Sequence, residues 1–427
     1  MKRIRIGVLG YGSVGSALVH LVEVEHDAIA ARTGLDLEVT SVAVRRVTPE
    51  RLAALGESVL TDDASSVVAD AGIDVVVELI GGVEPARSLI LEALNSGKPV
   101  ISGNKELIAN VGAELFVAAQ KNNVDLLFEA AVAGGIPLLR VLRESLLGER
   151  IQRMMGIVNG TTNYILTQMS ENGAEYGEAL TEAQQLGYAE ADPTADVEGG
   201  DAAAKAAIMA TIAFGAEVYA GDVYKEGISR ITAEDIASAA HMGHVIKLLA
   251  VVEEIDGEIS ARVHPVMVPS THPLASVRNS FNAVFIEGEA VGDLMLYGHG
   301  AGGDPTASAV LGDLIEASAN LERGIYSGLG TLRHARVKPI DECVSAFCVH
   351  VTVRDRPGVL AEVAGVFGQH GVSIRSMEQA AQADIANIVF ITHSAKEADL
   401  RMTLRELRTN DSVVEIGSVI RVVAPEA

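Results

Sequence analysis

The first 130 residues alternate short apolar runs with longer amphipathic stretches. The apolar run at residues 4–9 predicts a strand, and the stretch over residues 13–31 predicts a helix directly after it. Further strands are expected at residues 37–44, 73–80, 99–102 and 124–128. Because strands that alternate with helices pair in parallel, the pattern predicts a doubly wound parallel sheet of the Rossmann type, covered by helices on both faces.

From residue 151 to about residue 291 the pattern changes to longer helices mixed with strands. An Ala-rich stretch predicts a helix over residues 201–215, and a second helix is expected over residues 241–252. Residues 283–289 have the pattern of a strand, and residues 304–323 predict another helix that could pack back on the first sheet. The middle of the chain is therefore expected to form an α+β domain.

The tail follows a segment, residues 331–340, that carries four basic residues and a proline and is typical of a linker. Beyond it the predicted order is strand, helix, strand, strand, helix, strand, at residues 347–353, 358–370, 373–380, 385–392, 395–409 and 413–423. This βαββαβ order predicts a ferredoxin-like module of about 80 residues.

Length and composition narrow the class of protein. A chain of 427 residues has room for about three domains. Its formal net charge of −24 disfavours binding to nucleic acid or to an anionic membrane surface. With 48% hydrophobic and 21% charged residues it is expected to be globular, and with 4% aromatic residues and no Trp it offers few platforms for stacking bases.

Two cysteines, Cys343 and Cys348, are too few for a disulfide framework and favour a reducing, cytoplasmic location. No apolar run approaches the roughly 18 residues that a membrane-spanning helix needs. The basic and apolar N-terminus has some features of a signal peptide, but its repeated glycines fit a strand and a glycine turn better.

The sequence Gly10-Tyr11-Gly12-Ser13-Val14-Gly15 is a G-x-G-x-x-G motif between a predicted strand and a predicted helix. In that context Gly10 makes the tight turn, Gly12 lets a pyrophosphate approach the backbone, and Gly15 allows close packing of helix on strand. The alternative is an ordinary strand-turn-helix connection. The placement favours a dinucleotide site that also includes Ser13 and Val14.

Arg45 and Arg46 follow the second predicted strand, where an NAD-binding unit usually carries an acidic residue for the ribose hydroxyls. Two guanidinium groups suit a 2′-phosphate, so the sequence favours NADP, with NAD as the alternative. A solvated basic turn would account for the same residues.

Two further segments follow predicted strands at the same edge of the sheet, Gly81-Gly82 and Ser102-Gly103-Asn104-Lys105. Doubly wound sheets bind their ligands at this carboxyl edge. Lys105 is therefore a candidate to reach the nicotinamide or the substrate, although a lysine after a strand is also common on protein surfaces.

Asp201 and Lys205 are spaced i,i+4 on the Ala-rich helix and so lie on one face of it. The helix is apolar nearly all round, which predicts that it is buried. A buried ammonium group is costly, and its partner Asp201 keeps it charged. Acidic residues crowd the segment before it: Glu190, Asp192, Asp196 and Glu198. A lysine held protonated there could donate a proton to a carbonyl while the carboxylates receive a cationic amine. The alternative is an ion pair on a helix surface.

Glu129 ends a predicted strand just before the tight Ala133-Gly134-Gly135-Ile136 segment. One carboxylate and several free carbonyl oxygens could hold a hard cation. A hydrogen-bonded glutamate at a strand end is the simpler interpretation.

Taken together, these motifs resemble those of homoserine dehydrogenases of the long bacterial form, over essentially the whole chain. The matching segments are the glycine loop, Asn104-Lys105, residues 129–137, residues 159–166, residues 187–193, Asp201 with Lys205, and residues 300–307. The tail, with Asp355-Arg356-Pro357-Gly358-Val359-Leu360, resembles an ACT domain, a family of amino-acid-sensing modules.

The resemblance implies NAD(P)-dependent interconversion of L-aspartate 4-semialdehyde and L-homoserine in threonine and methionine synthesis. It implies that Lys205 donates the proton and that Glu190 and Asp201 bind the substrate amino group or an intervening water. The site would also be lined by Gly160, Thr161, Tyr188 and Asp196. Lys105 would lie between cofactor and substrate, and its share in the proton transfer stays open.

The resemblance also implies a sodium site, cofactor contacts and an effector. Sodium would be bound by Glu129, Val132, Gly134 and Ile136, and further cofactor contacts would come from Ile80, Gly81 and Gly302. Threonine is the expected effector of the ACT domain, and a homodimer or homotetramer is the expected assembly.

The hydrophobic pattern and the resemblance together give the expected division of the chain into domains. Residues 1–130 would bind the dinucleotide, with residues 304–330 packing back on them. Residues 131–303 would form the substrate-binding, catalytic and dimerisation domain, residues 331–346 a linker, and residues 347–427 the ACT domain.

The residues argue against two other functions. A semialdehyde dehydrogenase that works through a thioester needs a cysteine nucleophile, and both cysteines lie at the junction with the tail, away from the cofactor half. A non-catalytic sensor of dinucleotide and amino acid would leave the Asp201 and Lys205 pair without a role. Both are therefore disfavoured.

Overall fold

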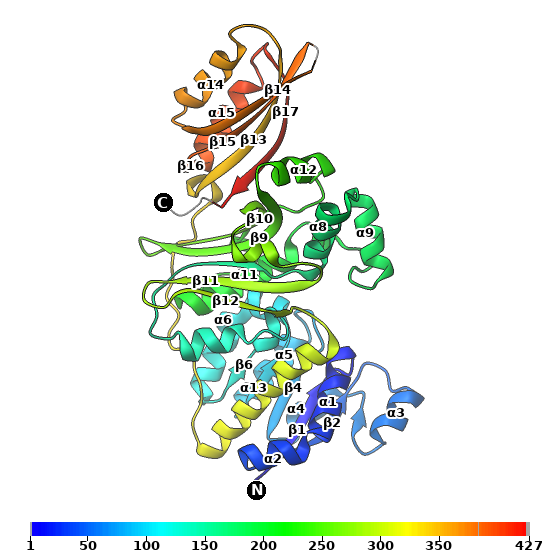
Figure 1. The fold of residues 1–427 in the computed structure, drawn as a ribbon. Coiled ribbons are helices and arrows are strands. Elements are labelled where there is room, and N and C mark those ends of the chain that lie inside the picture. Colours follow the sequence, from blue (N-terminus) through cyan, green and yellow to red (C-terminus); the bar gives the residue numbers. More distant parts are fainter. Residues whose placement is uncertain (1, 383, 424–427) are drawn as a thin grey trace. The chain divides into compact units, whose positions relative to one another are not determined.

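The alternation of strand and helix at the start of the chain produces a six-stranded parallel sheet in the order β3-β2-β1-β4-β5-β6. Strands β1, β2, β4 and β6 of this sheet are labelled in Figure 1. Its strands are β1 (Lys2–Leu9), β2 (Leu35–Ala43), β3 (Leu60–Thr61), β4 (Val75–Glu78), β5 (Val100–Ser102) and β6 (Leu126–Leu127). β1 pairs with β2 on one side and with β4 on the other. The strand order therefore reverses beside β1, and the predicted Rossmann-type sheet is confirmed.

The structure is a computed structural model that describes residues 2–382 and 384–423. It divides into two units. Unit 1 comprises Met1–Met154, Ala204–Val223 and Phe281–Ala335, and unit 2 comprises Met155–Ala203, Tyr224–Ser280 and Arg336–Ala427. β7 (Ile151–Ile157) and α11 (Gly200–Phe214) have residues in both units.

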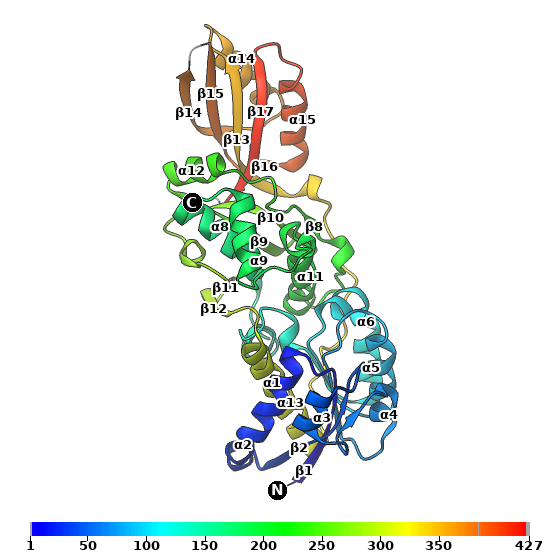
Figure 2. The ribbon, with the colours of Figure 1, turned by 90° about the vertical axis from the view of Figure 1, so that its right-hand side faces the viewer.

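Helices cover both faces of the parallel sheet in unit 1. They are α1 (Ser13–Val24), α2 (His26–Thr33), α3 (Pro49–Leu55), α4 (Ala64–Ala69), α5 (Ala86–Asn95), α6 (Lys105–Asn122) and α13 (Gly303–Arg323). The helix predicted over residues 13–31 is therefore two helices. α13 comes late in the chain but lies beside α1 (Figure 2), and its Val310 and Leu314 share a buried core with Ile4 and Ile6 of β1.

Unit 1 also contains a short 3₁₀ turn at Glu129–Ala131, the single turn α7 (Leu138–Arg140) and a π-helical turn at Val141–Ser145. An antiparallel hairpin joins β11 (Phe281–Gly288) to β12 (Gly292–His299). Among the described residues, no helix is long and apolar enough to cross a membrane.

The helices of unit 2 are α8 (Gly160–Asn172), α9 (Tyr176–Gln185), α10 (Thr194–Val197), α12 (Ala233–His241) and the start of α11. A long antiparallel pair, β9 (His244–Ile255) and β10 (Glu258–Pro269), follows them, and β8 (Tyr224–Lys225) pairs with β10. The predicted helix over residues 241–252 was wrong. The run of Val, Ile and Leu in this segment pairs with β10 over its whole length, and burial between neighbours favours the strand.

The last part of unit 2 has the order β13 (Val344–Arg354), α14 (Val359–Gln369), β14 (Ile374–Gln382), β15 (Ile385–Thr392), α15 (Glu397–Leu407) and β17 (Val413–Val422), with a short β16 (Ala395–Lys396) before α15. β17, β13, β15 and β14 lie side by side, with α14 and α15 packed on one face (Figure 2). The predicted βαββαβ module is confirmed. The end of β17 pairs with β10, which joins this module to the rest of unit 2.

Candidate functional site

The glycine loop after β1 has the geometry that a dinucleotide needs. Gly10 has a φ of +107°, and a Cβ there would lie 2.5 Å from the Leu79 carbonyl oxygen. A Cβ at Gly15 would lie 2.2 Å from the Gly10 carbonyl oxygen, whereas one at Gly12 would have no atom within 4 Å. Two glycines are thus required by packing, and the third leaves open space where a pyrophosphate can approach the backbone.

Glu78, at the end of β4, organises the adjoining loops and was not predicted from the sequence. Its side chain is fully buried and accepts hydrogen bonds from the backbone N–H of Ile80 (2.8 Å) and Gly81 (3.2 Å) and from the Ser102 hydroxyl (2.7 Å). It therefore fixes the loops after β4 and β5 at the carboxyl edge of the sheet. A single carboxylate that ends an otherwise apolar strand was the available signal.

Lys105 is the first residue of α6 and is half-buried. Asn104 caps this helix by accepting a hydrogen bond from the Leu107 N–H at 3.1 Å, and its amide donates to the Gly82 carbonyl oxygen at 2.6 Å. The loops after β4 and β5 are thereby tied together, and Lys105 begins a helix whose N-terminus is at the same sheet edge as Gly81.

The other predicted cofactor residues surround the glycine loop. Ser13 and Val14 begin α1, and Gly302 is the N-cap residue of α13. A Cβ at Gly303 would lie 3.2 Å from the Ser13 carbonyl oxygen, so the start of α13 lies against the glycine loop. Arg45 and Arg46 follow β2 and are exposed. These residues fit a dinucleotide, with the open backbone at Gly12 as the observation that favours it.

Glu129 is buried, and its two carboxylate oxygens accept the N–H groups of Leu139 (2.8 Å) and Arg140 (2.6 Å). Ala133 and Gly134 follow with φ values of +57° and +52°, and a Cβ at Gly134 would lie 2.4 Å from the Gly300 carbonyl oxygen. The loop is thus tightly folded beside a single carboxylate. Carboxylate and carbonyl oxygens are the donors that a hard cation prefers, so Glu129, Val132, Gly134 and Ile136 fit a sodium ion by chemistry.

A buried ion network supports this loop from α13. The Glu129 N–H donates to Asp313 Oδ2 at 2.8 Å, and Arg140 Nη2 lies 2.9 Å from Asp313 Oδ1. Burial raises the pKa of Asp313 to about 7, against the opposing effect of the Glu129 N–H and the Arg140 guanidinium. Burial likewise raises the pKa of Glu129. Asp313 was not predicted, because the contact joins residues 184 positions apart.

In unit 2 the Asn159 side chain brings two predicted substrate residues together. Its amide nitrogen lies 2.6 Å from Asp196 Oδ1 and 2.9 Å from Asp201 Oδ2. Asn159 also caps α8, since its Oδ1 accepts the N–H of Thr162 at 2.9 Å. Asp201 of α11 and Asp196 of α10 are thus held by the residue that caps α8, and a helix N-terminus favours negative charge. Asn159 appeared in the sequence motif but was given no role.

Thr161 and Tyr188 also meet in unit 2. The Thr161 hydroxyl donates to the Tyr188 carbonyl oxygen at 2.5 Å, and the Tyr188 ring lies 4.9 Å from that of Tyr164. Gly160 begins α8, and a Cβ there would lie 2.6 Å from the Ser280 carbonyl oxygen. Tyr188 is 44% exposed, so the surface formed by Gly160, Thr161 and Tyr188 is accessible to solvent at Tyr188.

The acidic cluster predicted before α11 is only partly assembled. Asp201 is buried and Asp196 is half-buried, whereas Glu190, Asp192 and Glu198 are exposed. Lys205 lies one turn after Asp201 on α11 and is half-buried, with buried alanines on both sides of it. The predicted burial of the helix is correct for its apolar face, while the lysine itself reaches partial exposure.

A second region of unit 2 links the βαββαβ module to the segment before α12. The Arg421 guanidinium of β17 is buried and contacts both Glu397 carboxylate oxygens, at 2.5 and 3.0 Å, and Glu226 Oε1 at 2.9 Å. Burial would raise the pKa of Glu226, but the Arg421 charge lowers it below its usual value. Glu226 precedes Gly227, which packs against α10: a Cβ there would lie 2.2 Å from the Val197 carbonyl oxygen.

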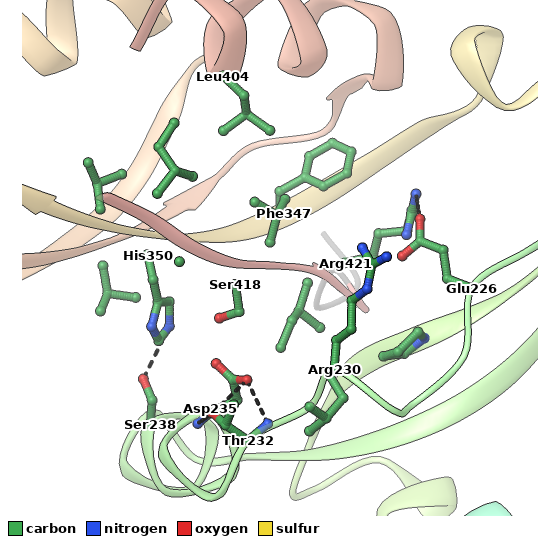
Figure 3. A pocket seen from close by; sticks show the side chains of 18 of the residues that line it. Glu226, Arg230, Thr232, Asp235, Ser238, Phe347, His350, Leu404, Ser418 and Arg421 are labelled. Carbon is green, nitrogen blue, oxygen red and sulfur yellow. Dashed lines mark hydrogen bonds and ion pairs between the residues drawn. The ribbon is translucent and has the colours of Figure 1, made fainter. Parts of the chain in front are cut away.

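A cavity of about 1290 Å³ lies beside this network (Figure 3). Arg230, Asp235 and Ser238 line it from one side, and His350 and Ser418 line it from the sheet of the module. Ser238 Oγ and His350 Nε2 are 3.3 Å apart, and burial lowers the pKa of His350. The Ser418 hydroxyl is buried without a hydrogen-bond partner among the described residues.

The parallel sheet has Rossmann topology, its glycine loop is open at Gly12, and the chain ends in a module of ferredoxin-like topology. This combination is typical of a nicotinamide-dependent oxidoreductase with an added C-terminal module. Three family profiles match the chain: the NAD-binding domain of homoserine dehydrogenase at residues 10–129, homoserine dehydrogenase at residues 137–315, and the ACT domain at residues 349–411.

Known proteins resemble the chain over most or nearly all of its length. It is 49% identical to the homoserine dehydrogenase of Corynebacterium glutamicum over 422 residues, covering 97% of this chain and 95% of that one. The crystal structure of a homoserine dehydrogenase from Thiobacillus denitrificans has a TM-score of 0.94 and 39% identity, covering 99% and 98%. A hyperthermophilic archaeal homoserine dehydrogenase in complex with NADPH has a TM-score of 0.64 and 31% identity, covering 74% and 98%.

The chain belongs to the homoserine dehydrogenase family. Its predicted activity, the NAD(P)-dependent interconversion of L-aspartate 4-semialdehyde and L-homoserine, and its ACT domain are confirmed at the level of the family. The chain is therefore an enzyme, and the alternative of a non-catalytic sensor was wrong.

Proposed function

We propose that Lys205 protonates the aldehyde oxygen of L-aspartate 4-semialdehyde, and that Asp196, Asp201 and Glu190 bind its ammonium group. The observation that carries this assignment is the Asn159 amide, which holds the Asp196 and Asp201 carboxylates together one helical turn from Lys205. The bound nicotinamide supplies a hydride to the carbonyl carbon. The proton from Lys205 completes the alcohol, so hydride and proton together account for the two added hydrogens.

Each residue type suits its proposed task. Lys205 carries an ammonium proton to donate, and Asp201 lies one turn before it on the same face of α11. The proposed substrate site would also be lined by Thr161, which contacts Tyr188, and by the backbone of Gly160. Lys105, at the start of α6, is a second candidate for contact with the substrate or the nicotinamide. We assign the proton donation to Lys205 and contact with the substrate or the nicotinamide to Lys105.

We propose NADPH as the preferred reductant. Arg45 and Arg46 are exposed directly after β2, where two guanidinium groups suit a 2′-phosphate. The archaeal relative in complex with NADPH supports this preference. A sodium ion bound by Glu129 and the carbonyl oxygens of Val132, Gly134 and Ile136 would stabilise the tight loop that begins at the end of the parallel sheet.

We propose that threonine inhibits the enzyme through the ACT domain and that the Arg421 and Glu226 ion pair transmits the signal. Arg421 belongs to the ACT domain, and Glu226 adjoins Gly227, which packs against the α10 helix of Asp196. The cavity beside the pair combines guanidinium, carboxylate and hydroxyl groups, which suits an amino acid. We also propose that the chain divides into the dinucleotide-binding, catalytic and ACT domains expected from the sequence. We propose further that it assembles as a homodimer or homotetramer and that it is cytoplasmic.

The test is the initial rate of NADPH oxidation with L-aspartate 4-semialdehyde, with and without threonine, repeated with NADH. Lys205→Ala should keep the affinity for NADPH and lose about 10²- to 10⁴-fold in kcat, the usual contribution of a general acid. Lys121→Ala, an exposed lysine on α6, is the matched control. Normal turnover by Lys205→Ala would overturn the proton-donor assignment.

A further inference from the structure

Lys247 is a buried ammonium group to which the proposed chemistry gives no task. It lies near the start of β9 and is only 2% exposed. Its Nζ donates to Asn163 Oδ1 at 3.0 Å and to the Val277 carbonyl oxygen at 2.5 Å. Burial lowers the pKa of Lys247 to about 8. A charge is costly to bury among neutral partners, so its presence needs an explanation.

Asn163, on α8, connects Lys247 to the segment at residues 277–280. It is 1% exposed, and its amide nitrogen donates to the carbonyl oxygens of Asn279 (2.9 Å) and Val277 (3.3 Å). Thr167, one turn later on α8, accepts the Asn279 N–H at 3.1 Å. The polar groups of α8, β9 and this segment thus form one buried cluster, with the ammonium group at its centre.

The same segment contacts the N-terminus of α8, where the substrate residues lie. A Cβ at Gly160 would come within 2.6 Å of the Ser280 carbonyl oxygen, so the helix has no room to move towards the segment. Asn159 lies one helical turn before Asn163, and the Asn163 N–H donates to the Asn159 carbonyl oxygen. A shift of α8 would therefore carry the Asn159 amide away from Asp196 and Asp201.

We propose that Lys247 is a positioning residue for the substrate site. Together with Asn163 it locks α8 against residues 277–280, and so it holds Asn159 where that amide can bring Asp196 and Asp201 together. This inference rests on the proposed assignment of the two carboxylates to the substrate ammonium group. Lys247 itself is too deeply buried to touch the substrate.

Lysine suits this position because two acceptor oxygens converge on one point. An ammonium group has three N–H donors and can satisfy both oxygens at once. A methionine of similar length would leave Asn163 Oδ1 and the Val277 carbonyl oxygen buried without this donor. We expect the buried hydrogen bonds of the cluster to rearrange, because unsatisfied acceptors are costly. This rearrangement would shift α8 and with it Asn159, its N-cap residue.

The decisive experiment is steady-state kinetics on Lys247→Met in the full chain, beside Asp196→Asn and the exposed control Lys121→Met. We expect Lys247→Met to raise the KM for L-aspartate 4-semialdehyde at least tenfold, with kcat and the KM for NADPH within twofold of wild type. We expect Asp196→Asn to raise the same KM. In the double variant the two effects should fall short of multiplying, since both act through the same carboxylates.

The outcomes separate this proposal from the substrate-site assignment. A normal KM for the semialdehyde in Asp196→Asn would overturn the assignment of that carboxylate. Two results would overturn the positioning role alone. One is a raised KM for the semialdehyde in Asp196→Asn with a normal one in folded Lys247→Met. The other is an equal rise in the KM values for the semialdehyde and for NADPH in Lys247→Met. If Lys247→Met does not fold, Lys247→Gln keeps an N–H donor in place, and it should show the same selective rise in smaller measure. A wild-type KM in Lys247→Gln would then count against the proposal.

Discussion

The Arg421 guanidinium of β17 lies 2.9 Å from the Glu226 carboxylate, although the two residues are 195 positions apart in the chain. Arg421 is held on its other side by Glu397 within the same βαββαβ module, so its position is fixed by the module itself. Glu226 lies in the segment that packs against α10. The pair is therefore a direct contact between the ACT domain and the part of unit 2 that carries Asp196.

If this contact transmits inhibition, Glu226→Gln should weaken the response to threonine and leave the uninhibited rate unchanged. The neutral amide removes the charge attraction but keeps the shape of the side chain. Coupling between sites is commonly about 1–3 kcal/mol, so the threonine concentration for half-inhibition should rise about fivefold or more. Glu114→Gln breaks an ion pair with Arg87 in unit 1 and serves as the control. Equal inhibition of Glu226→Gln and wild type would exclude this route, whereas an uninhibited wild type would exclude threonine regulation itself.

Removing both guanidinium groups after β2 should change the choice of cofactor. In the double variant Arg45→Ala/Arg46→Ala we expect the KM for NADPH to rise about tenfold or more, because charge-assisted contacts with a 2′-phosphate are lost. The KM for NADH should stay within twofold, since NADH has no 2′-phosphate. The measurement is the ratio of kcat/KM for the two cofactors, with Arg32→Ala on α2 as an exposed control. A parallel rise in both KM values would argue that the arginines support the fold instead.

His264 on β10 should make the protein sensitive to acid. Its ring is 2% exposed, Nδ1 lies 3.2 Å from the Pro265 carbonyl oxygen, and burial lowers its pKa well below the usual value. Because the folded-state pKa is depressed, the neutral ring contributes its full stability above pH 6.5, and that stability is lost as the pH falls. The slope is at most about 1.4 kcal/mol per pH unit for one group.

The check is the melting temperature of wild type and His264→Gln between pH 7.5 and pH 5. His264→Gln cannot titrate, so its melting temperature should fall less steeply with acid than that of wild type, even if the variant is less stable at pH 7.5. His393→Gln removes an exposed histidine and should leave the wild-type slope unchanged. Parallel curves for His264→Gln and wild type would show that another group controls acid stability.

Elements with a local signal in the sequence could be predicted without the structure. The glycine loop is one such signal: Gly10 and Gly15 are required by contacts with Leu79 and with Gly10 itself, and their spacing directly after a strand was enough to predict the turn. The βαββαβ order of the tail could also be predicted, because hydrophobic residues recur at different spacings in strands and helices and turns separate the elements. The helix predicted over residues 241–252 failed because a dense run of Val, Leu and Ile suits either structure, and pairing with β10 decided it.

The tertiary structure alone decided which polar groups meet. Asn159, Asp196 and Asp201 come from three elements, Lys247 and Asn163 are 84 positions apart, and Asp313 reaches Glu129 across 184 positions. Periodicity along a chain reports which face of an element is buried, but not which element covers it. The partners of a buried charge are set by the packing of whole helices and strands, and there an unpaired group is too costly to leave. The residue types of the site could therefore be predicted from the sequence, and the network that holds them could not.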